Sequence, residues 1–443
     1  MSSTAATPPP SHRDSWPVGA AFEDMPLNSR HVLAGGTLFV AFVLEAWEML
    51  ALVYIGADVR RSLGIDAASL GTLVSALFLG MIPGSLLAGT VADRYGRRRT
   101  CVWSLALYGV CTVAAAFAPG YGWLLAARFL AGFAVSGLHV MAFPYFEELL
   151  PVRVRGKATV YLSSGWALGL LLAVGSTSVL GGFGWRTVML ANALVALWAL
   201  AIRALVPESP YWLAARARQE QARAVLRRLG ARVPEDVALA VPEQKAGSVA
   251  AIFTGSLRRI TLVQVALNFV FAWGYWGLQT GLPELLARRG MSLPDTLAFT
   301  AVSAVCMIPG YLSASWLTHR FGRRPVFVGY ICAAAAGGVV FATASGAVAL
   351  YAGNLLLAFF SLGAFGVWNT WLAELYPTAV RGVGYGWGIF AQRVANTVAP
   401  SVIGVMAAGA VGFGATVAFI DVFLVVTALL AVRLPETEGA ALR

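Results

Sequence analysis

The stretch Gly89-Thr-Val-Ala-Asp93-Arg94-Tyr-Gly96-Arg97-Arg98-Arg99 is a short, strongly basic turn between two long apolar segments. A related turn, His319-Arg320-Phe321-Gly322-Arg323-Arg324, follows at an offset of 226 residues. The same offset aligns two further pairs of segments: Met81–Gly84 with Met307–Gly310, and Glu148–Gly156 with Glu374–Gly382. Three matched blocks in one register predict a duplicated chain with two similar halves.

The composition places both halves in a membrane. Hydrophobic residues make up 58% of the 443 residues, charged residues only 12%, and the mean hydropathy is +0.73. Soluble proteins are about half apolar and about one quarter charged. Because about 20 apolar residues span a bilayer as a helix, we predict an all-α membrane protein with twelve transmembrane helices. Their expected ranges are 32–56, 66–91, 100–118, 122–145, 158–181, 186–206, 260–282, 295–317, 325–345, 348–373, 383–407 and 412–433.

The net charge of +11 is explained by membrane topology rather than by binding of a polyanionic partner. Arginines gather on alternate turns, in the two basic turns, near Arg153 and Arg155, and in the central linker. The positive-inside rule therefore predicts that these turns and both termini are cytoplasmic, in a multi-pass protein of the inner membrane surrounded by lipid. No nucleic acid is expected as a partner.

The chain divides into five regions on this model. We expect a disordered cytoplasmic tail at 1–28 without a removable signal peptide, a six-helix bundle at 29–206, a cytoplasmic linker at 207–258, a second bundle at 259–434 and a tail at 435–443. Within the linker, 217–229 has the pattern of an amphipathic helix at the membrane interface. The four cysteines lack paired or metal-type spacing, so we expect no disulfide and no metal site.

Two carboxylates, Glu45 and Glu48, share one face of the first helix at a spacing of three residues. A charge at mid-bilayer costs about 2.5–3.5 kcal/mol on insertion scales, so such residues usually face a polar cavity or a partner. Arg128 lies too deep in the fourth helix to be a loop charge, and pairing with either glutamate is the structural alternative. His139 follows on the same helix, where a bond to a backbone carbonyl is the simpler interpretation.

Two more intramembrane charges lie in the second half. Arg393 begins about 15 Å into its helix at 1.5 Å per residue, so it needs an anionic partner. A substrate carboxylate is one candidate, while Glu284, Asp421 or a backbone carbonyl is the structural alternative. Asp421 lies in the last helix, either paired inward or without a role in transport.

Together, the Gly-x-x-x-Asp-Arg-x-Gly-Arg-Arg turn, the Arg128/Gly132 pattern and the paired ends Pro207-Glu208-Ser209 and Pro435-Glu436-Thr437 resemble the major facilitator superfamily over residues 25–440. The Pro-Glu-Ser-Pro-x-Trp-Leu element is similar to its sugar-porter-related branch. Met25-Pro26-Leu27 and Leu282-Pro283-Glu284 resemble metabolite:proton symporters of the aromatic-acid and nicotinate type.

Two departures accompany this resemblance. Those symporters carry Asp-Gly-aromatic-Asp where this chain has Glu45-Ala46-Trp47-Glu48, whose carboxylates reach one methylene further. Drug:proton antiporters carry a Gly-Pro pair in the fifth helix, whereas Gly165–Gly169 contains no proline.

The resemblance implies two six-helix bundles that rock around a central cavity and expose it alternately to the two sides. It suggests three sets of functional residues. The proton-coupling candidates are Glu45, Glu48 and Asp421. The substrate-binding candidates are Trp47, Arg128, His139, Asn268, Trp273, Trp276, Trp368, Asn369 and Arg393. The gating candidates are Gly89, Asp93, Arg94, Gly96, Arg97, Glu148, Arg155, Arg320, Arg324, Glu374 and Arg381.

We therefore expect a proton-coupled secondary transporter for a small organic solute, most consistent with an organic or aromatic acid, acting as a monomer. It is not expected to be an enzyme or to need a cofactor, and a gradient must supply the energy because no nucleotide-binding motif is present. The alternatives are efflux of a drug or natural product, and uptake of an organic cation or a sugar. A more remote alternative is a membrane receptor that does not transport.

Overall fold

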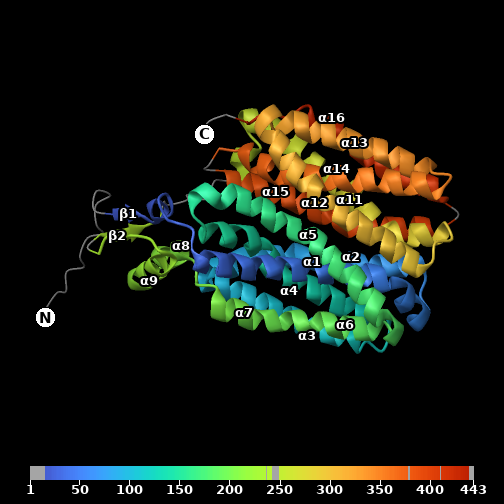
Figure 1. Ribbon diagram of the computed structural model, residues 1–443, viewed down its shortest axis with the longest axis horizontal. Helices are drawn as coiled ribbons and strands as arrows, with labels where there is room; N and C mark the ends of the chain where they lie inside the picture. The colour runs from blue at the N-terminus through green and yellow to red at the C-terminus, as the bar shows by residue number, and fades with distance from the viewer. Residues whose placement is uncertain (1–14, 236, 242–248, 378–379, 410, 439–443) are drawn as a thin grey trace.

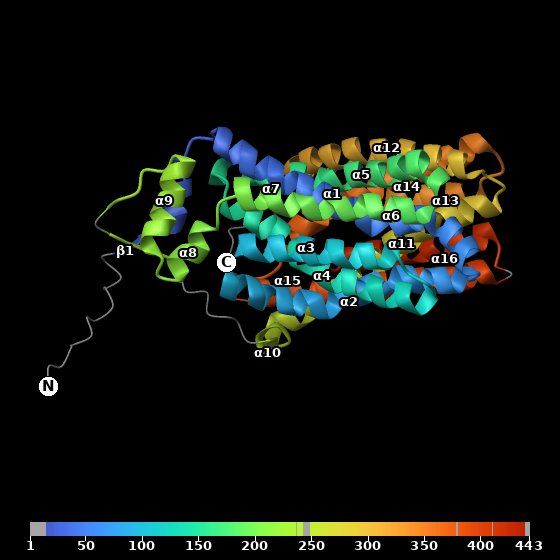
Figure 2. The same cartoon turned by 90° about the horizontal axis from the view of Figure 1, so that it is seen from below.

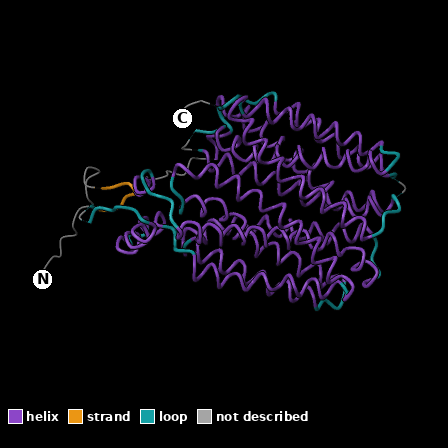
Figure 3. Tube along the Cα trace, viewed as in Figure 1, coloured by secondary structure: helices purple, strands orange, loops and turns teal. Residues whose placement is uncertain are grey.

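The computed structural model describes residues 15–235, 237–241, 249–377, 380–409 and 411–438, and this part of the chain is almost entirely helical (Figure 3). All twelve predicted spans are present. The N-terminal half contains α1 (Ser29–Leu63), α2 (Ala67–Tyr95), α3 (Arg97–Ala116), α4 (Tyr121–Glu148) and α5 (Val152–Leu180). After η3 (Gly181–Phe183), the sixth span is composed of α6 (Trp185–Ala193), η4 (Leu194–Leu197) and α7 (Trp198–Leu205). The C-terminal half contains α11 (Gly255–Arg288), α12 (Leu293–Phe321), α13 (Arg323–Thr343), α14 (Ala347–Glu374), α15 (Arg381–Ala408) and α16 (Phe413–Ala431).

Helix α15 differs from the other spans in its polarity. Within the described residues, 11 helical segments have the length and hydropathy of a membrane-crossing helix, and α15 is the long helix that is not among them. Its Gln392, Arg393 and Asn396 side chains are all buried against other helices. This helix therefore crosses the membrane with its polar face turned into the protein.

The two halves are separate bundles that lie side by side (Figure 1). Within the halves, α2 packs on α4 and α1 on α5, while α13 packs on α14 and α16. Contact between the halves runs through α2 against α15 and α5 against α12. The closest approach is at Gly71 of α2, where an added Cβ would meet the backbone of Pro400 and Gly404. Small residues allow such helices to touch where lipid provides no hydrophobic drive for association.

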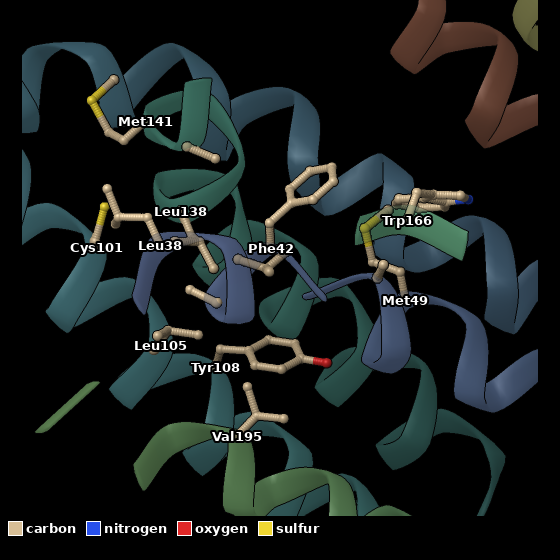
Figure 4. Packing of buried hydrophobic residues seen from close by; sticks show 14 of the residues in the cluster. Leu38, Phe42, Met49, Cys101, Leu105, Tyr108, Leu138, Met141, Trp166 and Val195 are labelled. Carbon is tan, nitrogen blue, oxygen red and sulfur yellow. The ribbon is translucent and has the colours of Figure 1, made fainter. Parts of the chain in front are cut away.

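The interior of the N-terminal half is a continuous apolar core. Figure 4 shows Phe42 and Met49 of α1, Tyr108 of α3, Leu138 of α4 and Trp166 of α5 converging in this core. Tyr108 is completely buried. This packing fixes the rotation of α1 and α4, and therefore the direction in which their charged side chains point.

A carboxylate caps the turn between the second and third helices in each half. Gly96 has φ +105° and ψ 157°, a conformation open almost only to glycine, and Glu208 Oε1 accepts the backbone N–H of Arg98 at 3.1 Å. In the second half, Gly322 has φ +92° and Glu436 accepts the backbone N–H groups of Arg323 and Arg324, both at 2.9 Å. Each Pro-Glu element thus ties the last helix of its half to the N-terminus of the third.

The environment of Glu436 shows how strong this cap is. Burial alone would raise the pKa of the Glu436 carboxyl, but hydrogen bonds from four backbone N–H groups hold that pKa below its ordinary value. The positive end of the helix adds to this effect because it favours a negative charge. Glu436 is therefore held as a carboxylate at neutral pH.

The tails and linker are more ordered than the sequence analysis predicts. Residues 15–28 were expected to be disordered. Instead, they include β1 (Ser15–Pro17) and η2 (Val18–Phe22), and β1 pairs in parallel with β2 (Ala238–Ala240). Residues 1–14 and 439–443 lie outside the described residues, whereas 435–438 fold back onto the turn after α12. Helix α11 begins at Gly255, inside the range assigned to the linker, after a short α10 (Val249–Ile252).

The linker helices α8 (Pro210–Ala215) and α9 (Gln219–Leu229) project beyond the end of the bundle that carries the basic turns (Figures 1 and 2). We call this the basic end. The buried residues of α9 are covered by protein rather than by a membrane surface, because α9 packs on α8 and β2. The segment before α1 joins this assembly, since Phe22 stacks on Tyr211 with ring centroids 5.7 Å apart.

The capped turn yields a stability prediction. Gly96→Ala should lower the free energy of unfolding by about 1–3 kcal/mol, because the turn conformation is strained for a residue with a Cβ and the new methyl group would meet Glu208. Gly89→Ala is the matched control, since nothing lies within 4 Å of a Cβ at that helical position. Thermal unfolding of the purified variants measures both. Equal midpoints for the two variants would show that the turn does not constrain the fold.

Candidate functional site

The two carboxylates of α1 each interact with a side chain of α4. Glu48 Oε1 lies 2.7 Å from Nη1 of Arg128, and the two side chains are 0% and 1% exposed. The second oxygen of Glu48 and Nε of Arg128 have no hydrogen-bond partner among the described residues. The sequence analysis left open whether Arg128 pairs with Glu45 or Glu48, and the structure selects Glu48.

Glu45 forms a different pair, one turn nearer the basic end. Its Oε1 is hydrogen-bonded to Nδ1 of His139, and its other oxygen has no partner among the described residues. Glu45 is fully buried, whereas the His139 side chain is 25% exposed. The partner of His139 is therefore the Glu45 carboxylate rather than a backbone carbonyl, and the imidazole connects this buried carboxylate to a more accessible position.

Arg393 approaches these groups from the other half. Its Nη1 lies 3.6 Å from the sulfur of Met81, and its Nε has no partner in the described part of the chain. No described carboxylate lies within ion-pairing distance of it, although it interacts electrostatically with Glu45 and His139. Of the proposed structural partners, Glu284 pairs with Arg60 instead, and Asp421 forms no ion pair with Arg393 among the described residues. Arg393 is thus a buried cation at the boundary between the halves without a direct counterion.

Asp421 does not belong to this group. It lies on α16, where its carboxylate meets the backbone of α13 beside Gly338. Its Oδ1 has no hydrogen-bond partner among the described residues. The structure therefore separates Asp421 from Glu45 and Glu48, with which the sequence analysis had grouped it as a proton-coupling candidate.

The aromatic candidates separate into different environments. Trp276 packs between the halves, with ring centroids 4.7 Å from Phe78 and 5.4 Å from Trp166. Trp273, three residues earlier, instead stacks on Phe423 of α16 at 4.9 Å. Trp273 is therefore part of the packing inside the C-terminal half.

Of the four remaining substrate-binding candidates, two are buried and two are only partly buried. Trp368 donates its indole N–H to Asn268 at 3.0 Å, and Asn268 in turn donates to Gln264 at 2.9 Å. These three side chains are buried inside the C-terminal half. Trp47 donates to Ser176 of α5 at 2.9 Å and, like Asn369 of α14, is only partly buried.

The gating candidates form equivalent contacts in the two halves. Arg97 pairs with Glu148 at 3.5 Å, and at the matching positions Arg323 pairs with Glu374 at 3.1 Å. Arg155 donates to the carbonyl of Leu150, as Arg381 does to that of Tyr376. Arg94 lies over Tyr95 as Arg320 lies over Phe321. Of the remaining candidates, Arg324 donates to the carbonyl of Leu434, and nothing lies within 4 Å of a Cβ added at Gly89.

Asp93 also makes its contacts within the N-terminal half. Its carboxylate pairs with Arg97 at 3.0 Å and is 74% exposed. Its backbone carbonyl accepts from Trp212 and Arg216, at 2.8 and 2.7 Å. At the basic end, every ion pair among the described residues therefore stays inside its own half or the adjoining linker.

At the opposite end, polar contacts join the two halves. Arg60 and Glu284 form an ion pair of 2.7 Å, and Ser75 bonds to Ser401 at 2.8 Å. Deeper in the protein, Trp166 donates to the hydroxyl of Tyr275 at 3.0 Å. Among the described residues, these polar contacts therefore join the halves at the opposite end, whereas the ion pairs of the basic end each stay within one half or the linker.

Sequence reasoning missed these contacts. The sequence analysis considered Glu284 as one possible partner of Arg393 and not of Arg60. Trp166 was not singled out. No local pattern links residues that lie 224 positions apart, like Arg60 and Glu284, or 109 positions apart, like Trp166 and Tyr275. The repeat offset relates equivalent positions rather than contacting ones. Among the predicted substrate-binding residues, Trp276 lies at this interface, with its ring centroid 5.4 Å from that of Trp166.

Comparisons with known proteins agree with this architecture. Residues 40–443 match the family model described as "Sugar (and other) transporter". The niacin transporter NiaP of Acinetobacter baylyi is 31% identical over 95% of this chain and 97% of its own length. The 4-hydroxybenzoate transporter PcaK of Pseudomonas aeruginosa is 31% identical over 79% of this chain and 80% of its own length.

Among solved structures, a partially occluded inward-open conformation of the xylose transporter XylE from E. coli superposes with a TM-score of 0.78. It is 20% identical and covers 94% of this chain and 100% of the XylE chain. At this identity the superposition supports the fold alone. The family match, the relatives and the twelve-helix architecture together show that the chain is a multi-pass membrane transporter of the sugar (and other) transporter family within the major facilitator superfamily.

Proposed function

We propose that this transporter takes up a small organic acid with an aromatic or heteroaromatic ring, together with a proton, by alternating access. The observation that carries the proposal is Arg393, a 3% exposed guanidinium at the boundary between the halves without a described carboxylate partner. A guanidinium binds a carboxylate through two parallel hydrogen bonds. A substrate carboxylate would therefore supply the missing counterion.

The relatives support this substrate class. NiaP and PcaK are named for niacin and 4-hydroxybenzoate, which are both ring carboxylic acids. In this chain, the aromatic rings of Trp276, Phe78 and Trp166 lie between the halves. Such rings favour a planar ligand through stacking and edge contacts.

Glu45 and His139 are our candidates for the transported proton. Protonation of Glu48 would remove the only described ion pair of Arg128, and a buried cation without its partner is costly. Glu45 has no cation as direct partner, and its contact His139 is partly accessible. Protonation of Glu45 would also change the charge near Arg393, which couples the proton to the anionic substrate.

The orientation of the protein in the membrane follows from the distribution of its positively charged loops. Because positively charged loops remain in the cytoplasm, we propose that the basic end faces the cytoplasm of a bacterial inner membrane. The opposite end, joined by Arg60 and Glu284, would then be closed on the outer side. The described conformation would correspond to the stage in which substrate and proton leave toward the cytoplasm.

Substrate recognition is tested at Arg393. Arg393→Lys should weaken binding of nicotinate or 4-hydroxybenzoate by about tenfold to a hundredfold, because an ammonium group cannot replace the planar guanidinium fork. Binding is measured by thermal shift of the purified protein, with nicotinamide as the neutral isosteric ligand and Arg60→Lys as the control variant. Unchanged affinity in Arg393→Lys, or stabilisation by cationic solutes alone, would remove the carboxylate assignment.

Proton coupling is tested at Glu45. Glu45→Gln should abolish accumulation of labelled substrate driven by a pH gradient in proteoliposomes, while counterflow exchange continues, since the amide cannot carry the proton. Glu220→Gln serves as the control because that glutamate is 87% exposed in the linker, outside both bundles. If Glu45→Gln still accumulates substrate and Glu48→Gln does not, Glu48 is the carrier. Accumulation by both variants excludes both residues.

We also propose that Asp93, one of the gating candidates at the basic end, controls the change between conformations, and this role is tested by substitution. Asp93→Asn should change the rate of exchange by more than it changes substrate affinity, because Asp93 acts on the balance between conformations and lies outside the binding region. Asp66→Asn is a matched control, since Asn caps a helix as well as Asp and Asp66 caps α2 at the opposite end. A variant that binds tenfold worse but exchanges normally would contradict the gating role.

A further inference from the structure

A cavity of about 240 Å³ lies outside the proposed transport route, on the surface of the N-terminal half. It is lined by Arg98, Arg99, Val102 and Trp103 of α3 and by Arg203 of α7. These residues occupy the first turns of α3 and the last turn of α7, so the cavity lies at the basic end. At about 30 Å³ per water molecule, its volume corresponds to about eight waters.

The cavity carries three positive charges without direct counterions. Among the described residues, no carboxylate lies within ion-pairing distance of the guanidinium groups of Arg98, Arg99 or Arg203. Glu208, which caps the turn, accepts the backbone N–H groups of Arg98 and Ser209. The site is therefore suited to an anion from outside the chain.

The surface beyond the cavity is apolar along both helices. On α3, Trp103 is followed by Leu107 and Val110 at helical spacing, and they are 49%, 48% and 65% exposed. On the other side, Leu200 of α7 and Leu197 of η4 lie three and six residues before Arg203 and are 65% and 61% exposed. Each helix thus presents a charged group at the basic end and an apolar stripe toward the middle of the membrane.

This arrangement matches the shape and polarity of one kind of ligand. We propose that the cavity binds the phosphate of an anionic phospholipid, whose acyl chains lie along the exposed apolar residues of α3 and α7. Trp103 would lie at the level of the head group, where aromatic side chains are enriched in membrane proteins. Basic clusters beside transmembrane helices attract anionic lipids of the cytoplasmic leaflet.

The second half lacks the main parts of this site. At the repeat offset of 226, Arg99 corresponds to Pro325 and Trp103 to Gly329. The capped turn is duplicated, but the arginine and the aromatic side chain are not. The cavity is therefore a feature of the N-terminal half alone and is not required by the capped turn itself.

The test uses the purified full-length protein, titrated with phosphatidylglycerol or phosphatidylcholine and analysed by native mass spectrometry. The wild type should retain phosphatidylglycerol preferentially, and the double variant Arg99→Gln/Arg203→Gln should lose at least tenfold in affinity, at about fivefold per arginine. Arg433→Gln is the matched control, an exposed arginine just after α16 in the other half. It should bind like wild type.

The outcomes separate the possible ligands. Thermal stabilisation by phosphatidylglycerol, absent in the double variant and not reproduced by inorganic phosphate, supports a lipid site. Equal phosphatidylglycerol binding by wild type and the double variant overturns the proposal. Stabilisation by inorganic phosphate to the same extent also overturns it, because the site would then hold a soluble anion. A thermal midpoint measured without lipid shows whether the double variant is folded.

Discussion

A charged side chain inside an apolar bundle requires a partner, and this requirement organises the centre of the protein. Glu48 and Arg128 form an ion pair at 2.7 Å, and Glu45 is bound to His139. These contacts join α1 to α4 through groups that neither lipid nor an apolar core can stabilise. Arg393 is the exception, a buried cation that interacts with Glu45 only at longer range and has no direct ion pair among the described residues.

Duplication accounts for the framework but not for these charges. At the repeat offset, Glu45, Glu48, Arg128 and His139 correspond to Phe271, Gly274, Asn354 and Phe365, and Arg393 corresponds to Ala167. The two halves thus share turns, caps and ion pairs at the basic end, while the acids lie in one half and the unpaired cation in the other. Movement of the halves would change the distance between opposite charges, which is the physical basis for coupling in our proposal.

The contacts between halves are unevenly distributed along the membrane normal. An ion pair, a pair of serine hydroxyls and the glycine contact at Gly71 lie at the opposite end. At the basic end, Arg97, Glu148, Arg323 and Glu374 form pairs within their own halves. Partly exposed ion pairs contribute only about 0–1 kcal/mol. Arg60–Glu284 is about 30% exposed on each side, so such a pair is compatible with repeated opening.

Several features were predictable because their signals are local or periodic. The twelve spans follow from hydropathy, and the matching turns at Gly96 and Gly322 follow from the fixed repeat offset. The sequence also indicated that Arg128 needs an acidic partner, since depth along a helix can be counted in residues. It did not predict the ordered residues 15–28, because their strand pairs with a linker segment more than 200 residues away.

The sequence by itself determined the number of helices, the duplication, the basic end and the chemical types buried in the membrane. Only the tertiary structure decided which of these groups meet. Trp273 and Trp276 share a helix but face different neighbours, and Asp421 is buried yet lies apart from Glu45 and Glu48. Hydropathy and spacing report the environment of each helix face. The rotation and packing of helices from distant parts of the chain determine the partner, and no single helix encodes that choice.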